Sequence, residues 1–184
     1  KTPLSIFIAD ELKKAKKNPV VIKKYYKNQK DEQLLIKNSG NSLILNKKRS
    51  NAIKIAEKRF DTVILDDGFQ DYTIKKDLNI LCFHGDQLIG NGYVIPSGPL
   101  RESISSLKKT ELIIINGKKN KKFEKKVLKI NKYIKIFYSK YTPINIKKYT
   151  NKKILVIAGI GNPENFFNLL KNHGCNIVRE FTFP

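Results

Sequence analysis

The chain has 184 residues, which suits one full domain or one domain with part of a second. Its formal net charge is +21, but only four of its 37 basic residues are arginines. Such a lysine-dominated charge, without clustered arginines and aromatics, argues against nucleic-acid recognition and for a compositional bias, although it still favours anionic lipid surfaces. The chain contains no methionine, and we interpret it as a piece cut at both ends.

The first third of the chain alternates between helical and extended patterns. Leu4, Ile8 and Leu12 recur every four residues within 3–17, a spacing that predicts an amphipathic helix. Short apolar runs further along predict strands, and the run "DTVILDD" is the most apolar of them. The predicted strands are 19–24, 41–46 and 61–67, and the further predicted helices are 31–38 and 51–60.

The rest of the chain continues the alternation. We predict strands at 78–84 and 111–117, a Gly/Pro-rich loop at 85–100 and a short helix near 101–108. Residues 118–135 are lysine-rich and amphipathic, which predicts a helix with a solvated face, or alternatively a basic helix on a membrane surface. A connector around 141–152 leads to a strand, tight turn, helix and strand over 153–183.

Strands that are apolar on both faces and separated by helices predict an α/β fold with a mostly parallel sheet and helices on both faces. We place a first domain at residues 1–147 and the beginning of a second, smaller α/β domain at 148–184. Ligands of such sheets bind at the carboxyl ends of the strands. The predicted strand 61–67 ends there in two adjacent carboxylates, Asp66 and Asp67.

These two aspartates and the first two residues of the chain together indicate a nucleotide site. Lys1 and Thr2 open a helix, as at the end of a P-loop, where the lysine binds phosphates and the hydroxyl binds Mg²⁺. A carboxylate at the end of a nearby strand binds the same metal ion. The plainer alternatives are an ordinary helix start and a strand-terminal turn with a helix cap. We prefer the nucleotide reading because the two elements occur together.

Four stretches carry a resemblance to a known family. They are "KTP" at the start of the chain, "DDGFQDY" with the later "GNGYVIPSGPLRE", and "AGIGNPENFF". Their order and spacing closely resemble the tetraacyldisaccharide 4'-kinases, the lipid A kinases of Gram-negative bacteria. "AGIGNP" also resembles a dinucleotide-binding loop, but it lacks the third glycine and an acidic ribose ligand, so we discount that reading.

The resemblance implies a P-loop kinase core joined to a smaller α/β domain. It implies ATP-dependent, Mg²⁺-dependent phosphoryl transfer to the 4'-hydroxyl of a tetraacylated glucosamine disaccharide 1-phosphate, the lipid A precursor. It further implies a peripheral protein on the cytoplasmic face of the bacterial inner membrane, touching an anionic membrane surface and not nucleic acid. We expect a monomer, and we expect the piece in hand to be inactive alone.

The resemblance also assigns roles to eight residues. Lys1 would neutralise the β- and γ-phosphates, Thr2 would hold Mg²⁺, and Asp66 and Asp67 would form the metal-binding acid pair. The other four residues would supply the base and the rest of the nucleotide and metal site. Asp31 would help to deprotonate the sugar hydroxyl, Glu32 would lie near the metal, and Arg101 and Glu102 would contribute to the nucleotide site.

A helix N-cap is the plainer alternative for Asp31. One stretch also departs from the family pattern, because this chain has "IKKYYKN" (22–28) where the family usually has S-R-G-Y-G. That departure keeps a non-catalytic paralogue open. A P-loop switch or partitioning ATPase that binds DNA or membrane is the alternative from another class, although it does not account for "GNGYVIPSGPLRE".

Overall fold

The computed structural model of the chain describes residues 1–27 and 30–183, so Asn28 of the departing stretch lies outside the described residues. The chain forms two compact units, Lys1–Ser139 and a second from Lys140 onward. Every pair of neighbouring strands in the named sheets is parallel, which confirms the predicted α/β class. The domain boundary expected after residue 147 stays a prediction.

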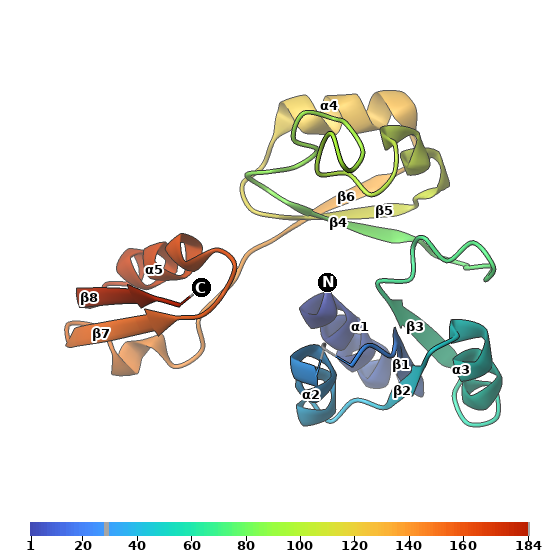
Figure 1. The fold of residues 1–184 in the computed structure, drawn as a ribbon, viewed down its shortest axis with the longest axis horizontal. Helices are drawn as coiled ribbons and strands as arrows, with labels where there is room; N and C mark the ends of the chain where they lie inside the picture. Colours follow the sequence, from blue (N-terminus) through green and yellow to red (C-terminus); the bar gives the residue numbers. More distant parts are fainter. Residues whose placement is uncertain (28–29, 184) are drawn as a thin grey trace. The chain divides into compact units, whose positions relative to one another are not determined.

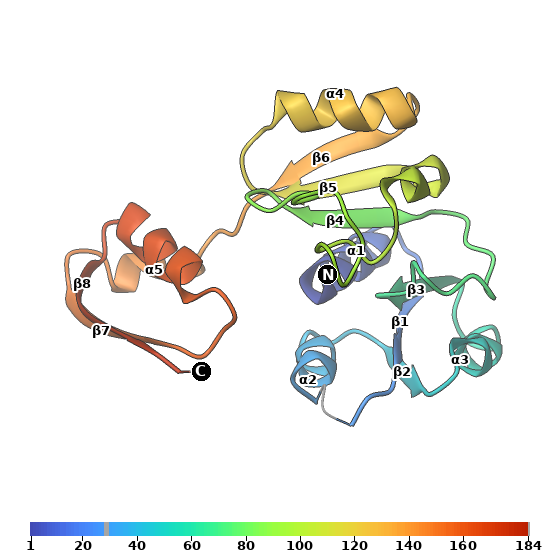
Figure 2. The same ribbon diagram turned by 45° about the horizontal axis from the view of Figure 1, so that its top comes forward.

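The first unit contains a sheet with strand order β2-β1-β3 and helices on both faces (Figures 1 and 2). On one face Val21 of β1 packs with Ala9 and Ile36, and on the other Val20 packs with Ala52. Successive side chains of a strand point to opposite faces, so a run of apolar residues serves both layers. The elements are α1 (Thr2–Lys14), β1 (Pro19–Lys24), α2 (Lys30–Asn38), β2 (Leu43–Asn46), α3 (Arg49–Ala56) and β3 (Thr62–Asp66).

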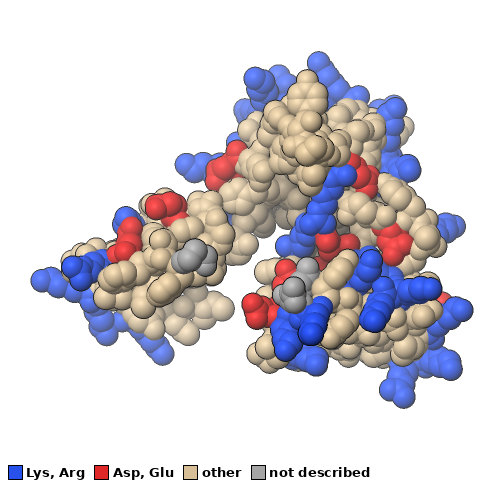
Figure 3. Space-filling model, in the orientation of Figure 1, with Lys and Arg blue, Asp and Glu red and all other residues tan. Residues whose placement is uncertain are grey.

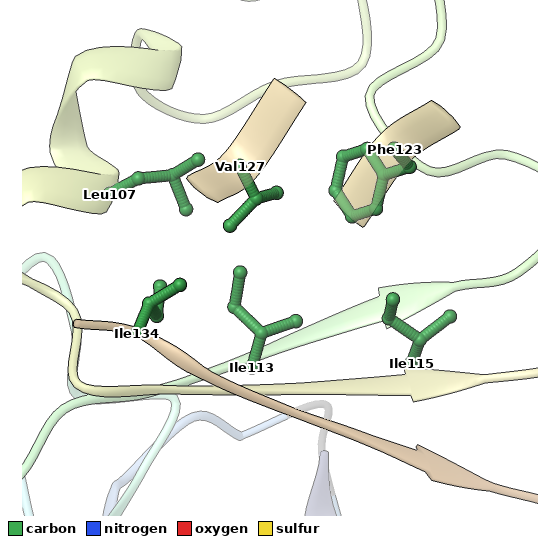
Figure 4. Packing of buried hydrophobic residues seen from close by; sticks show 6 residues of the cluster. All are labelled: Leu107, Ile113, Ile115, Phe123, Val127 and Ile134. Carbon is green, nitrogen blue, oxygen red and sulfur yellow. The ribbon is translucent and has the colours of Figure 1, made fainter. Parts of the chain in front are cut away.

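A second sheet of the same unit has the order β4-β5-β6. Helix α4 and the short 3-10 helix η1 cover one face of it and supply three of its six fully packed side chains (Figure 4). The Phe83 and Phe123 rings meet edge to face there, with centroids 5.2 Å apart. The elements are β4 (Ile80–His84), η1 (Ile104–Lys109), β5 (Leu112–Asn116), α4 (Lys121–Ile130) and β6 (Lys135–Ser139).

The lysine-rich stretch 118–135 is not one long helix, as the sequence suggested. The side chain of Asn120 caps α4 by accepting a hydrogen bond from the Phe123 amide at 2.9 Å, and the helix ends at Ile130. Strand β6 follows from Lys135 and was not predicted. Its alternate residues Ile136 and Tyr138 pack on the core, a period-two pattern too short to distinguish from the end of a helix.

The second unit has the predicted order of strand, turn, helix and strand. Asn162 caps its helix, and the two strands pair in parallel. Val156, Phe167 and Leu170 form a core of its own. The elements are η2 (Ile146–Lys148), β7 (Lys153–Ala158), α5 (Pro163–Asn172) and β8 (Asn176–Thr182).

The charged surface is basic without a single dominant patch on the face drawn. Lys and Arg side chains are scattered over that face, with fewer Asp and Glu between them (Figure 3). Among the helices of residues 1–27 and 30–183, none combines the length and the apolar character that crossing a bilayer requires.

Candidate active site

The carboxyl ends of strands β1 and β3 meet the start of helix α1. In the parallel register, Lys23 near the end of β1 lies opposite Asp66, the last residue of β3. Asp66 is only 1% exposed and Lys23 only 4%. Charged residues are rarely buried unless they are paired, so this end of the sheet needs an electrostatic explanation.

Asp66 receives hydrogen bonds on both carboxylate oxygens. Its Oδ1 accepts from Ser5 Oγ at 3.0 Å, and its Oδ2 accepts from Thr2 Oγ1 at 3.0 Å and from Lys23 Nζ at 2.8 Å. Thr2 and Ser5 are three residues apart, so they lie on the same face of α1. These contacts compensate the loss of water around a buried carboxylate and fix its orientation.

Lys23 connects three elements of the site. Its ammonium pairs with Asp66 of β3 and also with Glu32 in the first turn of α2, whose side chain is half-exposed. Burial pushes the pKa of Lys23 down, but the hydrogen bonds to Asp66 and Glu32 outweigh it and raise the pKa above its ordinary value of 10.5. Lys23 is therefore a permanent buried cation between two carboxylates.

Asp67 turns away from its neighbour toward a different pair of cations. Its φ of 55° is left-handed, a conformation that aspartate tolerates better than most residues. Lys1 Nζ lies 2.6 Å from Oδ1, and Arg101 Nη1 lies 2.9 and 2.8 Å from the two oxygens. Partial burial raises the pKa of Asp67, but the hydrogen bonds from Lys1 and Arg101 outweigh it and hold the pKa below its ordinary value of 3.8.

The glycine-rich loop brings Arg101 to this position. A Cβ atom on Gly98 would lie 2.2 Å from Asn91 Oδ1 and 2.4 Å from the Tyr93 carbonyl oxygen, so only glycine fits where the loop folds back. The Asn91 side chain donates to the Ser97 carbonyl at 2.8 Å and closes the loop. The sequence motif "GNGYVIPSGPLRE" thus acts as a spacer of defined shape ahead of Arg101.

Arg49, at the start of α3, supports both aspartates through their backbone. Its Nη2 donates to the carbonyl oxygens of Asp66 at 3.3 Å and Asp67 at 2.8 Å, and its Nη1 lies 3.5 Å from Asp71. The Asp71 carboxylate accepts a hydrogen bond from Thr73 Oγ1, which together with the charge of Arg49 holds the pKa of Asp71 below its ordinary value of 3.8 against the opposing effect of burial.

A basic cavity of about 370 Å³ adjoins Arg49. It lies at the N-terminus of α3, where backbone amides are available to an anion and the Lys48 side chain makes no capping hydrogen bond. The Arg49 Nε is buried and has no hydrogen-bond partner within the described residues. This chemistry suits a phosphate or another anion. The cavity is lined by Lys24, Lys47, Lys48, Arg49, Ser50, Asp71 and Thr73.

Comparison with known proteins identifies the family of this chain. The family described as Tetraacyldisaccharide-1-P 4'-kinase matches residues 1–184. A tetraacyldisaccharide 4'-kinase of Pelagibacter ubique (strain HTCC1062) is 42% identical over the whole chain, which covers 60% of that relative. The chain belongs to the tetraacyldisaccharide-1-P 4'-kinase family.

Other relatives carry the same name. The tetraacyldisaccharide 4'-kinases of Haemophilus influenzae (strain 86-028NP) and Shewanella sediminis (strain HAW-EB3) are 33% and 36% identical over 70% and 64% of the chain. This chain spans 38% and 34% of the length of those two relatives. No solved structure matched it.

The structure brings most of the predicted site residues of this kinase-family chain together. Lys1 and Arg101 meet at Asp67, and Thr2 meets Asp66. Glu32 joins them through Lys23. The other two predicted residues lie differently. Asp31 is exposed in the first turn of α2, and Glu102 accepts a hydrogen bond from the Tyr72 hydroxyl rather than contacting the aspartate pair.

Sequence patterns did not predict three residues of the site: Ser5, Lys23 and Arg49. Ser5 lies one helical turn after Thr2, and that spacing could have been noticed. A charged residue at the end of the wholly apolar run 19–22 could likewise have pointed to Lys23. Arg49 gave no such signal, because it binds the backbone carbonyl groups of Asp66 and Asp67, which no side-chain pattern in the sequence marks.

The oxygen donors of the kinase-family site fit a magnesium ion. Thr2 Oγ1 and the Asp66 carboxylate are hard oxygen ligands in direct contact, and the Asp67 carboxylate follows Asp66 in the chain. Mg²⁺ commonly takes only one or two protein carboxylates and completes its shell with water and substrate phosphates. The described residues contain no cluster of three or more His, Cys, Asp or Glu side chains that would form a self-sufficient metal cage.

Proposed function

We propose that the protein containing this chain transfers the γ-phosphoryl group of ATP to the 4'-hydroxyl of a tetraacylated glucosamine disaccharide 1-phosphate. Family membership supports the reaction class. The observation that carries the proposal is the 3.0 Å contact between Thr2 Oγ1 and Asp66 Oδ2, because it joins a helix-start hydroxyl to a strand-end carboxylate as a nucleotide-bound metal requires.

The chain's own residues supply positioning and charge in this proposal. Thr2 and Asp66 would hold Mg²⁺, with Asp67 as the second member of the acid pair. Lys1 binds the β- and γ-phosphates, and it leaves Asp67 to do so. Bound Mg²⁺ supplies neutralisation of the charge on those phosphates. Ser5 keeps the Asp66 carboxylate oriented throughout.

We further propose that Asp31 accepts the proton of the sugar hydroxyl. Its position in the first turn of α2, next to the Lys23-bound Glu32, supports that role, and its exposure leaves it accessible to an acceptor. Phosphoryl transfer needs only a positioned carboxylate as base. Arg101 is released from Asp67 toward the nucleotide, and Glu102 steadies the same loop through Tyr72.

The basic cavity beside α3 is suited to the phosphate that the acceptor already carries. Its four cationic side chains and the helix N-terminus attract an anion, whereas Asp71 is occupied by Arg49 and Thr73. Replacing Lys47 and Lys48 together by Gln should raise the acceptor KM about ten-fold, with little change in kcat, because only binding energy is lost. An unchanged KM would show that the cavity does not bind the phosphate of the acceptor.

We propose that the protein works as a peripheral protein on the cytoplasmic face of the bacterial inner membrane. The +21 net charge supports attraction to anionic lipid, and the acylated acceptor requires access to a bilayer. A monomer suffices for the site, since its residues all come from one unit of one chain.

The test is transfer of radiolabelled γ-phosphate from ATP to the disaccharide 1-phosphate in detergent micelles by the full-length protein. We expect a labelled lipid product that depends on Mg²⁺. Hydrolysis of ATP stimulated by DNA or liposomes, without a lipid product, would instead identify a switch or partitioning ATPase. Absence of both activities would identify a non-catalytic paralogue.

A further inference from the structure

Lys23 is a buried cation at the carboxyl end of strand β1, beside the proposed metal-binding carboxylate. Its side chain is 5% exposed and lies between the carboxylates of Asp66, 1% exposed, and Glu32, 50% exposed. The reaction proposed above gives it no role. A lysine is costly to bury, so its position against the metal-binding carboxylate calls for a function.

The geometry points to Lys23 as a resident counter-ion that sets the metal affinity of the site. Its ammonium and the magnesium ion compete for the negative charge of Asp66, so Lys23 weakens metal binding and keeps the carboxylate neutralised when no metal is present. This inference rests on the magnesium site of the proposed function. Lys23 is a positioning residue, because it contacts Asp66 and not the reacting groups.

The arrangement of donors around Asp66 supports the competition. Thr2 Oγ1 and Lys23 Nζ both bind the same oxygen, Oδ2, at 3.0 and 2.8 Å. A cation held by Thr2 and Asp66 therefore shares that oxygen with a lysine ammonium. Like charges in a buried setting repel strongly, since little water screens them.

Glu32 makes the competition adjustable. It shares the ammonium with Asp66, and because it is half-exposed it can turn toward solvent or a ligand. Asp66, Lys23 and Glu32 together carry a net charge of −1 when no metal is bound. Without Lys23 the same two carboxylates would carry −2, and attraction to a cation would rise by about ten-fold or more in affinity.

The test measures Mn²⁺ binding, as a paramagnetic probe for Mg²⁺, to the nucleotide-free full-length protein by the electron paramagnetic resonance signal of the free ion. We expect Lys23→Gln to lower the Kd for Mn²⁺ about ten-fold, and Lys23→Arg to leave it near the wild-type value. Lys14→Gln is the matched control, because it removes the lysine of an exposed ion pair with Glu11. It should not change the Kd.

Lys23→Met covers the case in which a buried amide prevents folding, because it keeps the aliphatic length without the charge. A Kd that is unchanged or higher in both uncharged variants would overturn the role of Lys23 while the metal site stands. Wild-type binding no tighter than that of Asp66→Asn, both without nucleotide and with a saturating non-hydrolysable ATP analogue, would overturn the metal site and this inference with it. The two failures are therefore distinguishable.

Discussion

The two three-stranded sheets of the first unit share a parallel architecture but end differently. The carboxyl ends of β1 and β3 hold Lys23 and Asp66 as a buried ion pair. At the corresponding ends of the second sheet stand His84, Asn116 and Ser139, of which the first and last are exposed. The first sheet has helices on both faces, whereas the core of the second is built under α4 and η1.

The difference shows that the place of a charged residue in the fold, and not the abundance of its type in the sequence, decides whether it is buried. Lysines are abundant along the whole chain, but within residues 1–27 and 30–183 only Lys23, at the end of the first sheet, lies buried between two carboxylates. One of these, Asp66, also accepts hydrogen bonds from helix α1. Apolar packing stabilises the second sheet. At the carboxyl ends of the first sheet's strands, hydrogen bonds to the Asp66 carboxylate hold the side chains in place. Each can be disturbed separately.

Truncation of Phe123 should give the largest loss of stability. Phe123 of α4 is 4% exposed and packs against the second sheet, so Phe123→Ala should lower the free energy of unfolding by about 3–5 kcal/mol through lost burial and a residual cavity. Phe137→Ala, at a ring that is 52% exposed on β6, is the control and should cost far less. Urea unfolding measures both, and equal losses would contradict the assignment of the core.

Removal of the Ser5 hydroxyl should have an intermediate effect at the other sheet. Ser5→Ala leaves Asp66 Oδ1 without its donor, and a hydrogen bond to a buried charged group contributes about 1.5–3 kcal/mol to the free energy of unfolding. Ser139→Ala, at the exposed end of the second sheet, should be nearly neutral. If urea unfolding gave the two variants the same stability, the comparison between the sheet ends would fail.

The smallest effect concerns the acid side of the pH profile. Because the folded-state pKa of Asp71 is lowered, its ionised form stabilises the fold above the ordinary value of 3.8, and that contribution is lost as pH falls through the lower folded value. Asp71→Asn should therefore cost about 0.5–1 kcal/mol at pH 7 and less at pH 2. Unfolding free energies at both pH values check this, and a difference that grows toward acid would contradict it.

Sequence patterns predict the frame of the site well. The apolar run before Asp66 predicts β3, and the amphipathic spacing after Thr2 predicts α1, because local periodicity follows directly from burial on one or two faces. Strand β6 was not predicted because the lysine-rich, amphipathic composition of α4 continues into it without a break.

The contacts of the site are harder to predict. Ser5 and Lys23 reach Asp66 across 61 and 43 residues of chain, so their partnership depends on strand order and register. Those follow from the packing of the whole unit. A single sequence gives the residue types, but the fold is needed to identify which of the many lysines is buried between carboxylates.

The most direct measurement compares phosphate transfer by Asp66→Asn and Asp61→Asn in the full-length protein. Asp61 precedes β3 and Asp66 is its last residue. Asp61 is exposed and accepts hydrogen bonds from Asn18 and Thr62, outside the site. The account predicts that Asp66→Asn lowers the rate of transfer to the disaccharide about 10³-fold, whereas Asp61→Asn stays near wild type. Transfer by Asp66→Asn at close to the wild-type rate would contradict it.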